Sequence, residues 1–301
     1  MTIQRRTLFA SLATVSAAAL VLTGCSADDG ADAESATPSA AMVQEIHDML
    51  PESIRDAGVI QVGTEAFYPP HEYFAEDEET IIGVDPDIVY ALGDILGVEM
   101  NLENMAWDGL LPALDAGRID MIAAAMGVTE ERVQKYDFVS YFNTVQGATV
   151  LAGNSNNISV AADLCGLNIS VLDGSHQLDE LEKFNAAECA GNEMTVMPFP
   201  ADSDALQQLQ NGRADAHIAQ FPAASYNAET FGGGDTFEAL PMDDLAPQIL
   251  ALSLAKDSTE LRDALQAAMN ELIDSGLYAE ILAEHGLESG AIVESEINPL
   301  I

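Results

Sequence analysis

The stretch VIQVGTEAFYPP at residues 59–70 decides the fold of this 301-residue chain. Its first five residues form a strand-like run, and residues 85–96 (DPDIVYALGDIL) then show the apolar spacing of a helix. Residues 99–103 and 121–124 are again strand-like, and residues 109–116 between them are helical. Because short strands that alternate with helices form βαβ units, the sequence predicts an α/β fold with a mainly parallel sheet.

A strand-like run at residues 147–151 leads to a polar turn cluster at residues 153–157 (GNSNN), and a second series of such runs follows it. A cluster of this composition predicts the end of a first structural unit. After it we expect strands at residues 167–172, 194–197, 214–219 and 248–254, and helices at 177–187, 203–210, 223–230, 259–275 and up to His285. The sequence therefore predicts two packed units.

The composition excludes one large class of function. The chain has 50 Asp and Glu residues against 10 Lys and Arg, which gives a formal net charge of −40. A nucleic-acid partner needs a broad cationic surface, so we expect no nucleic-acid binding. Hydrophobic residues make up 48% of the chain, which is enough for one large core or two modest ones and argues against a wholly disordered acidic protein.

The first 24 residues contain no acidic residue and are typical of a secretory signal peptide. Arg5 and Arg6 precede an apolar run of about 15 residues, which is shorter than the ~20 that a membrane span needs. The small residues before Cys25 resemble the bacterial lipobox, so we expect cleavage there and a lipid anchor on Cys25. The alternative is an ordinary signal in which Cys25 is incidental. The Arg pair leaves a twin-arginine export route open.

Residues 25–50 are expected to form a lipidated tether. Within them, residues 26–41 (SADDGADAESATPSAA) carry no large apolar side chain, so they cannot bury enough surface to fold. The globular part is expected from about Met42, and its first lobe from residue 51. Residues 289–301 show no clear pattern and are expected to be a tail.

Cys165 and Cys189 flank a predicted strand and helix. Disulfides persist in exported proteins, so we expect these residues to form a bridge; two buried free thiols are the alternative. No His or second Cys lies at zinc-ligand spacing, and no glycine-rich nucleotide loop follows a strand. The sequence therefore indicates neither a metal nor a cofactor.

A series of short motifs resembles the family 3 extracellular solute-binding proteins, the polar amino-acid receptors of ABC importers. In chain order the motifs are VIQVGTEAFYPP (59–70), GVDPDI (83–88), WDGLLPAL (107–114), GRID (117–120), TEER (129–132), YDFV (136–139), DLCG (163–166), GRADA (212–216) and GLY (276–278). The resemblance covers roughly residues 51–287. It implies a periplasmic-binding-protein type II fold, in which two α/β lobes are joined by two hinge crossings and the second lobe is inserted in the first.

The resemblance, together with the turn cluster and Pro247, sets lobe I at residues 51–151 and 247–288 and lobe II at residues 152–246. It implies a monomeric receptor, anchored outside the cell membrane, that closes around a polar amino acid or related carboxylated solute and delivers it to an ABC permease. Two other functions stay open on this fold: an exported cyclohexadienyl or arogenate-type dehydratase, and a ligand-sensing module.

Arg132 stands where the family has its carboxylate-binding Arg, and a guanidinium binds a carboxylate through two parallel hydrogen bonds. The alternative is a surface Arg that pairs with Glu130 or Glu131. Trp107, the only Trp, is expected to stack against a ligand, or else to be a core residue.

Four more residues are expected to line the ligand site. Tyr68 would form a wall, unless it only packs at a strand end. Glu65 stands where the family often has Asp and would face a ligand amine, unless it is a solvated loop acid. Ser175 and His176 precede a predicted helix whose N-terminus would hold an anionic ligand group; Ser175 would instead, or in addition, cap that helix.

The chain departs from the family pattern at several positions. Gln220 stands where an Asp commonly binds the α-ammonium group of the ligand, and it offers no counter-charge. Ala125 and Gly127 stand where the family often supplies hydroxyl groups, which leaves only backbone groups for a ligand. His71 replaces the usual Phe. We therefore expect a ligand with a carboxylate, whereas its amine is not indicated.

Overall fold

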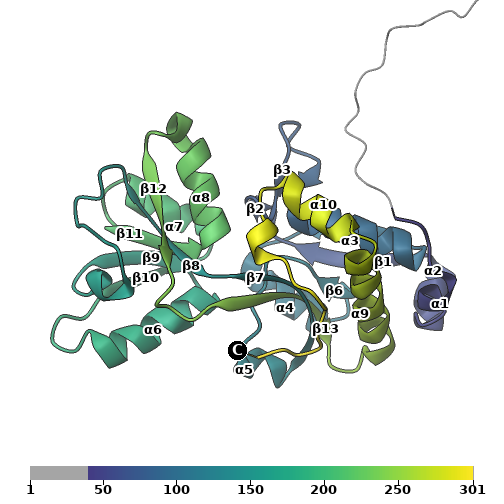
Figure 1. Ribbon diagram of the computed structural model, residues 1–301. Helices are drawn as coiled ribbons and strands as arrows, with labels where there is room; N and C mark the ends of the chain where they lie inside the picture. The colour runs from purple at the N-terminus through teal and green to yellow at the C-terminus, as the bar shows by residue number, and fades with distance from the viewer. Residues whose placement is uncertain (1–39, 301) are drawn as a thin grey trace, which may run out of the picture. The chain divides into compact units, whose positions relative to one another are not determined.

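The structure, a computed structural model, describes residues 40–300. The predicted signal peptide, the predicted lipidation site Cys25 and most of the predicted tether lie outside this range. In order, the first elements are α1 (Gln44–His47), α2 (Glu52–Ala57), β1 (Val59–Thr64), β2 (Phe67–Tyr68), β3 (Glu72–Phe74), β4 (Ile81–Ile82), α3 (Val84–Leu96), β5 (Glu99–Asn104), α4 (Trp107–Asp115), β6 (Met121–Ile122), α5 (Glu130–Val133), β7 (Tyr136–Thr144) and β8 (Gln146–Leu151) (Figure 1).

The remaining elements follow the same alternation. They are η1 (Ala161–Leu164), β9 (Asn168–Leu172), α6 (His176–Glu188), β10 (Thr195–Phe199), α7 (Asp202–Gln210), β11 (Ala216–Gln220), α8 (Phe221–Thr230), η2 (Phe231–Gly234), β12 (Phe237–Met242), β13 (Gln248–Ala255), α9 (Thr259–Asp274), α10 (Leu277–Glu284) and η3 (Glu288–Gly290). The predicted α/β class is confirmed. Within residues 40–300, no helix combines the length and the apolar composition that a membrane crossing requires.

Two five-stranded sheets organise the described residues. The first has the order β5-β1-β6-β13-β7, and the second has the order β10-β9-β11-β8-β12. In the first sheet β1 is parallel to β5 and β6, whereas β13 is antiparallel to β6 and β7. In the second, β9 is parallel to β10 and β11, and β8 is antiparallel to β11 and β12. Each sheet is therefore mainly parallel, as predicted, with one reversed strand.

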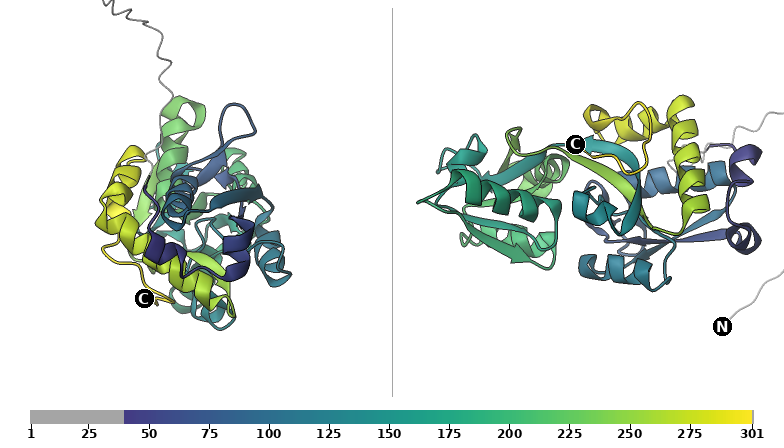
Figure 2. Two further views of the ribbon diagram at one scale, coloured as in Figure 1. Left: turned by 90° about the vertical axis from the view of Figure 1, so that its right-hand side faces the viewer. Right: turned by 90° about the horizontal axis from the view of Figure 1, so that it is seen from below.

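The reversed strands are the ones that arrive from the other lobe. Val145 joins β7 of the first sheet to β8 of the second, and residues 243–247 lead from β12 of the second sheet back to β13 of the first. Thr144 pairs with Gln248, so the two crossings run side by side (Figures 1 and 2). The fold is the predicted two-lobe type II arrangement, with the second lobe inserted in the first.

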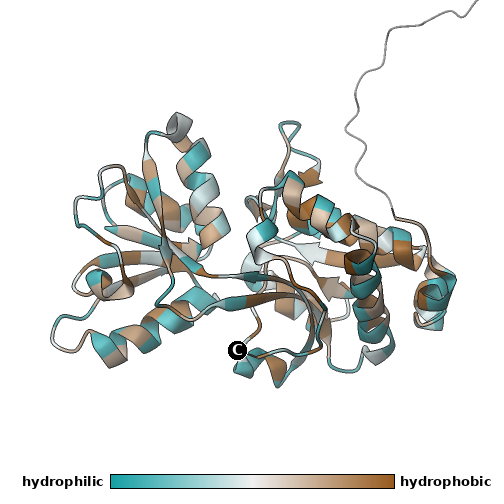
Figure 3. Cartoon of the chain, viewed as in Figure 1, coloured by the Kyte–Doolittle hydropathy of each residue, from teal (hydrophilic) through white to brown (hydrophobic). Residues whose placement is uncertain are grey.

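Helices cover both sheets because successive strand residues point to opposite faces. In β13, Leu250 and Leu252 join the core that α3, α9 and α10 cover, whereas Ala251 joins the smaller core under α4. In the second lobe, Leu181 of α6 belongs to one core, and Leu209 of α7 belongs to another, which also contacts α8. Figure 3 shows apolar and polar residues alternating along α6 and α9, as expected of helices that cover a core on one side.

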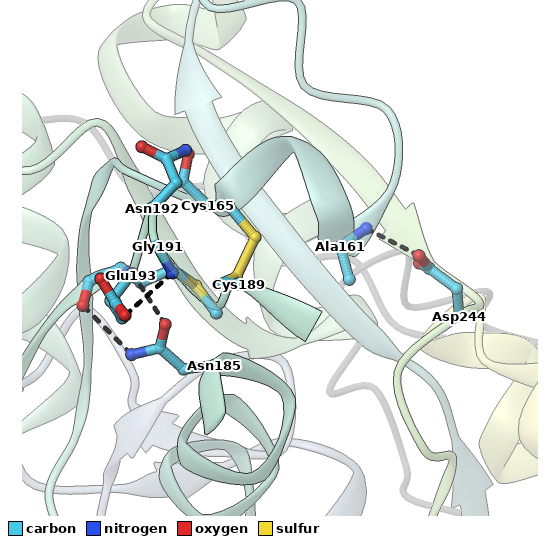
Figure 4. Close-up of a disulfide and its surroundings, with 9 residues drawn as sticks. Ala161, Cys165, Asn185, Cys189, Gly191, Asn192, Glu193 and Asp244 are labelled. Atoms are coloured by element: carbon cyan, nitrogen blue, oxygen red, sulfur yellow. Dashed lines mark hydrogen bonds between the residues drawn. A yellow bond between two sulfur atoms is a disulfide. The ribbon is translucent and has the colours of Figure 1, made fainter. Parts of the chain in front are cut away.

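The predicted bridge between Cys165 and Cys189 is confirmed, with the two Cα atoms 5.3 Å apart (Figure 4). The turn beside it is fixed by amide side chains. Asn192 Nδ2 donates to Cys165 O over 3.0 Å. Asn185 Oδ1 accepts from the backbone nitrogen of Met194 (2.7 Å), and Asn185 Nδ2 donates to Met194 O (3.1 Å). The bridge therefore ties the end of α6 to the segment before β9.

The lobe limits in the structure differ by a few residues from those expected. Residues 146–151 were expected in the first lobe, but β8 pairs with β11 and β12, so the first crossing is at Val145. A hydrophobic run that ends in a turn cluster locates the end of a strand and does not show which sheet the strand joins.

Residues 43–50 pack on the first lobe, although they were expected to belong to the tether. The backbone nitrogen of Val43 donates to Ile95 O over 2.9 Å. Ile46 and Leu50 are 8% and 1% exposed and join the core beside α3 and α9. Two well-placed apolar side chains dock this short helix despite the acidic sequence around it.

Residues 289–300, expected as a tail, also pack on the first lobe. Ile297 forms an antiparallel bridge with Val139 of β7, the edge strand of the first sheet. Ser295 Oγ donates to Ser140 O over 2.7 Å, and the backbone nitrogen of Asn298 donates to Phe138 O over 2.9 Å. Backbone and polar side-chain hydrogen bonds make much of this pairing, so no hydrophobic period marks it in the sequence.

Candidate ligand-binding site

The two lobes enclose a cavity to which both contribute walls. The residues that line it are Glu65, Tyr68, Glu72, Trp107, Ala124, Ala125, Gly127 and Arg132 of the first lobe, Leu172, Ser175, His176, Gln177 and Gln220 of the second, and Gln248 at the start of β13. The structure thus brings together all nine residues predicted to contact a ligand. The sequence analysis missed the other lining residues, which are the apolar Ala124 and Leu172 and the polar Glu72, Gln177 and Gln248. Glu72 directly follows the opening motif and His71, which offered a signal, whereas the two glutamines lie in unremarkable runs.

Arg132 reaches the cavity from the short helix α5. Thr129 caps this helix, and its Oγ1 accepts a hydrogen bond from the backbone nitrogen of Arg132 (3.1 Å). The guanidinium donates through Nη1 to Gly127 O (2.8 Å) and through Nη2 to Gly174 O of the second lobe (2.7 Å). The ion pairs formed among the described residues do not include Arg132, so the alternative of a surface pair with its helix neighbours is wrong.

The positive charge of Arg132 is held by neutral groups. Its two acceptors are backbone carbonyls, and its guanidinium carbon lies 5.7 Å from the centre of the Trp107 ring. Burial lowers the pKa of Arg132 from its ordinary value, although Asp179 and Glu131 act in the opposite direction. Trp107 is half-buried and packs on the α4 core, so it is both a cavity wall and a core residue. A carboxylate that replaced the carbonyls would form a stronger, charge-assisted pair.

Ser175 and His176 bring the N-terminus of α6 to the cavity. Ser175 Oγ accepts from Leu178 N (3.2 Å) and donates to Leu172 O (2.7 Å), so the predicted helix cap is present. Both ring nitrogens of His176 are buried without a hydrogen-bond partner among the described residues. Burial is the main cause that lowers the pKa of His176, which favours a neutral ring.

Gln220 and Tyr68 connect the lobes across the cavity. Gln220 Nε2 donates to Ala125 O (2.8 Å), and the backbone nitrogen of Gln220 donates to the Tyr68 hydroxyl (3.0 Å). Ala125 has φ of +45°, and its backbone nitrogen is held by Asp85 Oδ2 (2.8 Å), so its carbonyl is firmly placed. Gln220 Oε1 is buried and has no partner among the described residues. The backbone of Ala125 thus supplies the polar contact that a hydroxyl side chain was expected to supply in the family.

Gly127 leaves room for a second bridge between the lobes. A Cβ atom at this position would lie 1.9 Å from Gln248 Nε2. Gln248 fills that space, and its Oε1 accepts from Gln177 Nε2 of the second lobe over 2.9 Å. The absence of a side chain at residue 127 therefore makes the Gln177–Gln248 contact possible.

Two carboxyl groups also line the cavity. Glu65 and Glu72 are 7% and 1% exposed, so Glu65 is not a solvated loop acid. Burial, and then the negative charge of Asp202, raises the pKa of Glu65 to about 8. Burial, and then Asp85 and Glu65, raises the pKa of Glu72 well above its ordinary value. The lining of the cavity therefore contains a guanidinium and two buried carboxyl groups.

The cavity is narrow. The volume open to the centre of a water-sized sphere is about 20 Å³. A volume of this size holds about one water molecule. A larger ligand must part the contacts that cross the cavity, among them Arg132 to Gly174 and Gln220 to Ala125. Within residues 40–300, no three His, Cys, Asp or Glu side chains are grouped so that they would hold a metal ion.

Comparison with known families shows which family has this fold. Residues 60–288 match the model of the bacterial extracellular solute-binding proteins, family 3. The chain belongs to this family. Family 3 solute-binding proteins are extracytoplasmic, which agrees with the N-terminal sequence, and the resemblance noted from the motifs is confirmed.

Several family 3 relatives are amino-acid-binding proteins. The arginine-binding protein ArgT of Corynebacterium glutamicum is 31% identical over 265 residues, which cover 85% of this chain and 83% of the relative. The L-cystine-binding protein TcyJ of Escherichia coli is 30% identical over 74% of this chain and 80% of the relative. An L-arginine-binding protein of Pseudomonas aeruginosa is 30% identical, over 74% and 85% of the two chains.

Solved structures of the family share the fold. An ancestral arginine-binding protein bound to glutamine superposes with a TM-score of 0.68 and 30% identity, covering 77% of this chain and 99% of that one. An ancestral amino-acid-binding protein described as a precursor of cyclohexadienyl dehydratase has a TM-score of 0.69 and 25% identity, covering 77% and 97%. These relatives support a solute-binding role for this family 3 protein.

Proposed function

We propose that the chain is the amino-acid-binding component of an ABC importer, which captures its solute between the two lobes and delivers it to a membrane permease. The observation that carries this proposal is the guanidinium of Arg132. It lines the cavity between the lobes, and the structure gives it two backbone carbonyls as acceptors. A ligand carboxylate would compensate the charge of this group better than those carbonyls do.

Closure of the lobes is the proposed mechanism. Arg132, Gln220 and Gln177 each make a hydrogen bond from one lobe toward the other side of the cavity. A ligand that contacts both walls favours the closed form, because only a difference in affinity between two forms shifts their equilibrium. The closed monomer would then present both lobes to the permease.

The ligand class follows from the relatives and from the polar groups that line the cavity. The similar proteins named above bind arginine or cystine, and one solved structure holds glutamine; all of these ligands carry a carboxylate. In this chain, Arg132 would bind the carboxylate, and Ala125 O with Gln220 Oε1 would accept from an amine. A polar amino acid or a closely related carboxylated solute therefore fits best.

The N-terminal region would keep the receptor at the membrane. We propose that residues 1–24 are removed as a signal peptide, that Cys25 then carries acyl chains, and that the segment before residue 43 serves as the tether. Labelling cells with a radioactive fatty acid tests this anchor. Label on the protein that disappears in a Cys25→Ala variant, with release of that variant to the medium, is the expected result; an unlabelled protein would disprove lipidation.

A thermal-shift panel of amino acids, amino-acid derivatives and small carboxylates tests the receptor function. A ligand at 100 times its dissociation constant stabilises the folded protein by about 2.7 kcal/mol, which is easily measured. Arg132→Ala should weaken binding at least about 30-fold, because a buried charge partner is lost. The exposed Arg118 provides a matched control, since Arg118→Ala removes the same charge away from the cavity. Equal affinities for wild type and Arg132→Ala would overturn the proposed site.

The enzyme alternative is tested with the same protein. The curated relatives named above are binding proteins, and the ancestral neighbour bears the description of an amino-acid-binding precursor of a dehydratase. We infer that the chain binds without turnover. Incubation with prephenate should yield no aromatic keto acid; formation of that product at a rate that depends on Glu65 would establish a dehydratase instead.

A further inference from the structure

The ring of His71 is fully buried against a wall residue of the cavity. His71 lies in the turn before β3, and its exposed fraction is 0%. Its ring stacks on the ring of Tyr68, with centroids 5.8 Å and planes 13° apart, and lies nearly perpendicular to the ring of Phe142, with centroids 5.9 Å apart. Neither ring nitrogen has a hydrogen-bond partner among the described residues. Because a buried polar group without a partner costs free energy, packing alone does not account for this ring.

The carboxyl group of Asp85 in α3 lies beside the ring. His71 Nδ1 is 3.6 Å from Asp85 Oδ1, which is also buried without a hydrogen-bond partner within residues 40–300. The other carboxyl oxygen, Oδ2, accepts from the Tyr141 hydroxyl (2.5 Å). The ion pairs that Lys and Arg form in the same range do not include Asp85. An imidazole this close stabilises a buried carboxylate, most strongly as an imidazolium, because the two groups are shielded from water.

Asp85 and Tyr68 each support one contact that Gln220 of the second lobe makes with the first. Asp85 Oδ2 accepts from the backbone nitrogen of Ala125 (2.8 Å), and Ala125 O accepts from Gln220 Nε2. The Tyr68 hydroxyl accepts from the backbone nitrogen of Gln220. Both hydrogen bonds that Gln220 donates toward the first lobe therefore lead back to the ring of His71, one through Asp85 and one through Tyr68.

The backbone of this turn has hydrogen bonds of its own. His71 N donates to Tyr68 O over 3.0 Å, and Asp85 N donates to His71 O over 3.0 Å. These bonds do not involve the side chain of His71. Side-chain variants at residue 71 therefore test the ring and not the path of the chain.

We propose that His71 is a positioning residue for lobe closure: its ring fixes Tyr68 by stacking and Asp85 through Nδ1, so that both acceptors of Gln220 are held in place. Acceptors that are oriented in advance lower the cost of ordering the groups that meet on closure. His71 does not line the cavity, so it acts through these two residues. The inference rests on the proposed function, in which closure traps the solute.

Two substitutions separate the two contributions of the ring. His71→Phe keeps an aromatic ring against Tyr68 but has no nitrogen beside Asp85. His71→Asn keeps a side-chain nitrogen close to the position of Nδ1 but has no ring. His285→Phe is the matched control, because His285 Nε2 lies 2.7 Å from Asp87 Oδ2 in the same helix α3 and this pair does not line the cavity. Circular dichroism confirms that each variant is folded, and either substitution tests one contribution if the other does not fold.

Hydrogen exchange of the Ala125 backbone amide, followed by NMR without added amino acid, measures the contribution through Asp85. His71→Phe should accelerate this exchange at least about tenfold, because Asp85 then holds the amide less firmly. His71→Asn and His285→Phe should change it less than about threefold. A ring that only fills space would be replaced by Phe without effect, so an unchanged exchange rate in His71→Phe would overturn the inference.

Isothermal titration calorimetry tests the connection to Gln220. The probes are L-arginine and L-glutamine, and each substitution at residue 71 should weaken their binding about tenfold. In a Gln220→Ala background, which lacks Nε2, His71→Phe should cause less than about twofold further loss, whereas His71→Asn should keep its effect. In a Tyr68→Phe background, which lacks the hydroxyl, the two substitutions should exchange these roles. Full effects of both substitutions in both backgrounds would contradict the positioning role.

The two proposals fail in different ways. If the wild type binds a probe in an Arg132-dependent manner but the substitutions at residue 71 act independently of Gln220 and Tyr68, the receptor function stands and the positioning role is wrong. If no amino acid binds to the wild type, the receptor function is wrong, and exchange of the Ala125 amide still decides whether His71 positions Asp85.

Discussion

Gln220 Nε2 of the second lobe donates a hydrogen bond to Ala125 O of the first lobe over 2.8 Å. The other end of the same amide, Oε1, is buried without a partner among the described residues. The amide thus joins the lobes through its donor and keeps an acceptor beside the cavity. A ligand amine would meet two neutral oxygens here but no full negative charge.

Gln220→Asp should therefore change both closure and selectivity. The carboxylate cannot donate to Ala125 O, so the contact between the lobes is lost until a ligand amine donates to both oxygens. We expect the affinity for zwitterionic amino acids to rise about tenfold, since a hydrogen bond to a charged group contributes about 1.5–3 kcal/mol. Titration calorimetry with the wild type and with the exposed-site control Gln207→Asp checks this result. No gain in affinity would show that residue 220 does not meet the amine.

Gly127→Ala should weaken the contact between Gln177 and Gln248. The new Cβ atom would lie 1.9 Å from Gln248 Nε2, so the amide must move and its bond to Gln177 is lost. Overpacking of this kind costs about 1–3 kcal/mol. Removing the obstructed side chain as well, in Gly127→Ala with Gln248→Ala, should restore stability in urea unfolding relative to Gly127→Ala alone. If the double variant is no more stable than the single one, the loss of stability in Gly127→Ala does not come from the clash with Gln248.

Arg132 and the cavity walls could be predicted from the sequence because they combine rare residue types with ordered motifs. Ten cations occur in 301 residues, so a cation at a motif position is informative, and the lone Trp, which lies in the motif WDGLLPAL, is informative for the same reason. The helices and parallel strands follow from hydrophobic periods. The strand β7 was not predicted as an element, because its buried residues 136–142 run continuously without alternation.

Gln248 and Glu72 show what the sequence could not provide. The contact partner of Gln248 is Gln177, 71 residues away, and neither residue belongs to a periodic pattern. Gln248 can occupy its place beside the cavity only because Gly127, which belongs to a third segment of the chain, has no side chain. The place of Glu72 after the opening motif indicated that it lies near the cavity, but its burial depends on the packing of β3 with α3 and β4 and is not indicated by an acidic residue in an acidic chain.

Loss of the bridge between Cys165 and Cys189 should destabilise the protein by roughly 3 kcal/mol. The two residues are 24 positions apart, and closing a loop of this length lowers the entropy of the unfolded chain by about that amount. Urea unfolding of the Cys165→Ala, Cys189→Ala double variant measures the change. Ligand affinity should stay within about threefold of wild type, because the two residues do not line the cavity. Unchanged stability would mean that the bridge does not appreciably lower the entropy of the unfolded chain.

The pH dependence of stability offers a check on the burial of Glu65 that requires no ligand. Its pKa in the folded protein, about 8, lies above the ordinary value of 4.5, so its stabilising contribution is complete below about pH 4.5 and is lost as pH rises through 8. Over this window the free energy of unfolding should fall by up to about 1.4 kcal/mol per pH unit on account of this residue.

Glu65→Gln should remove that slope, as measured by urea unfolding at pH 5, 6, 7 and 8, whereas Glu99→Gln should keep it. Asp137 cannot produce the same effect. Burial raises its pKa, but hydrogen bonds from Lys256, Asn298 and Arg262 outweigh burial and lower it, so its contribution is lost only as pH falls below the ordinary range of an Asp. A slope between pH 5 and pH 8 that is the same in wild type and Glu65→Gln would show that Glu65 is ionised throughout this range.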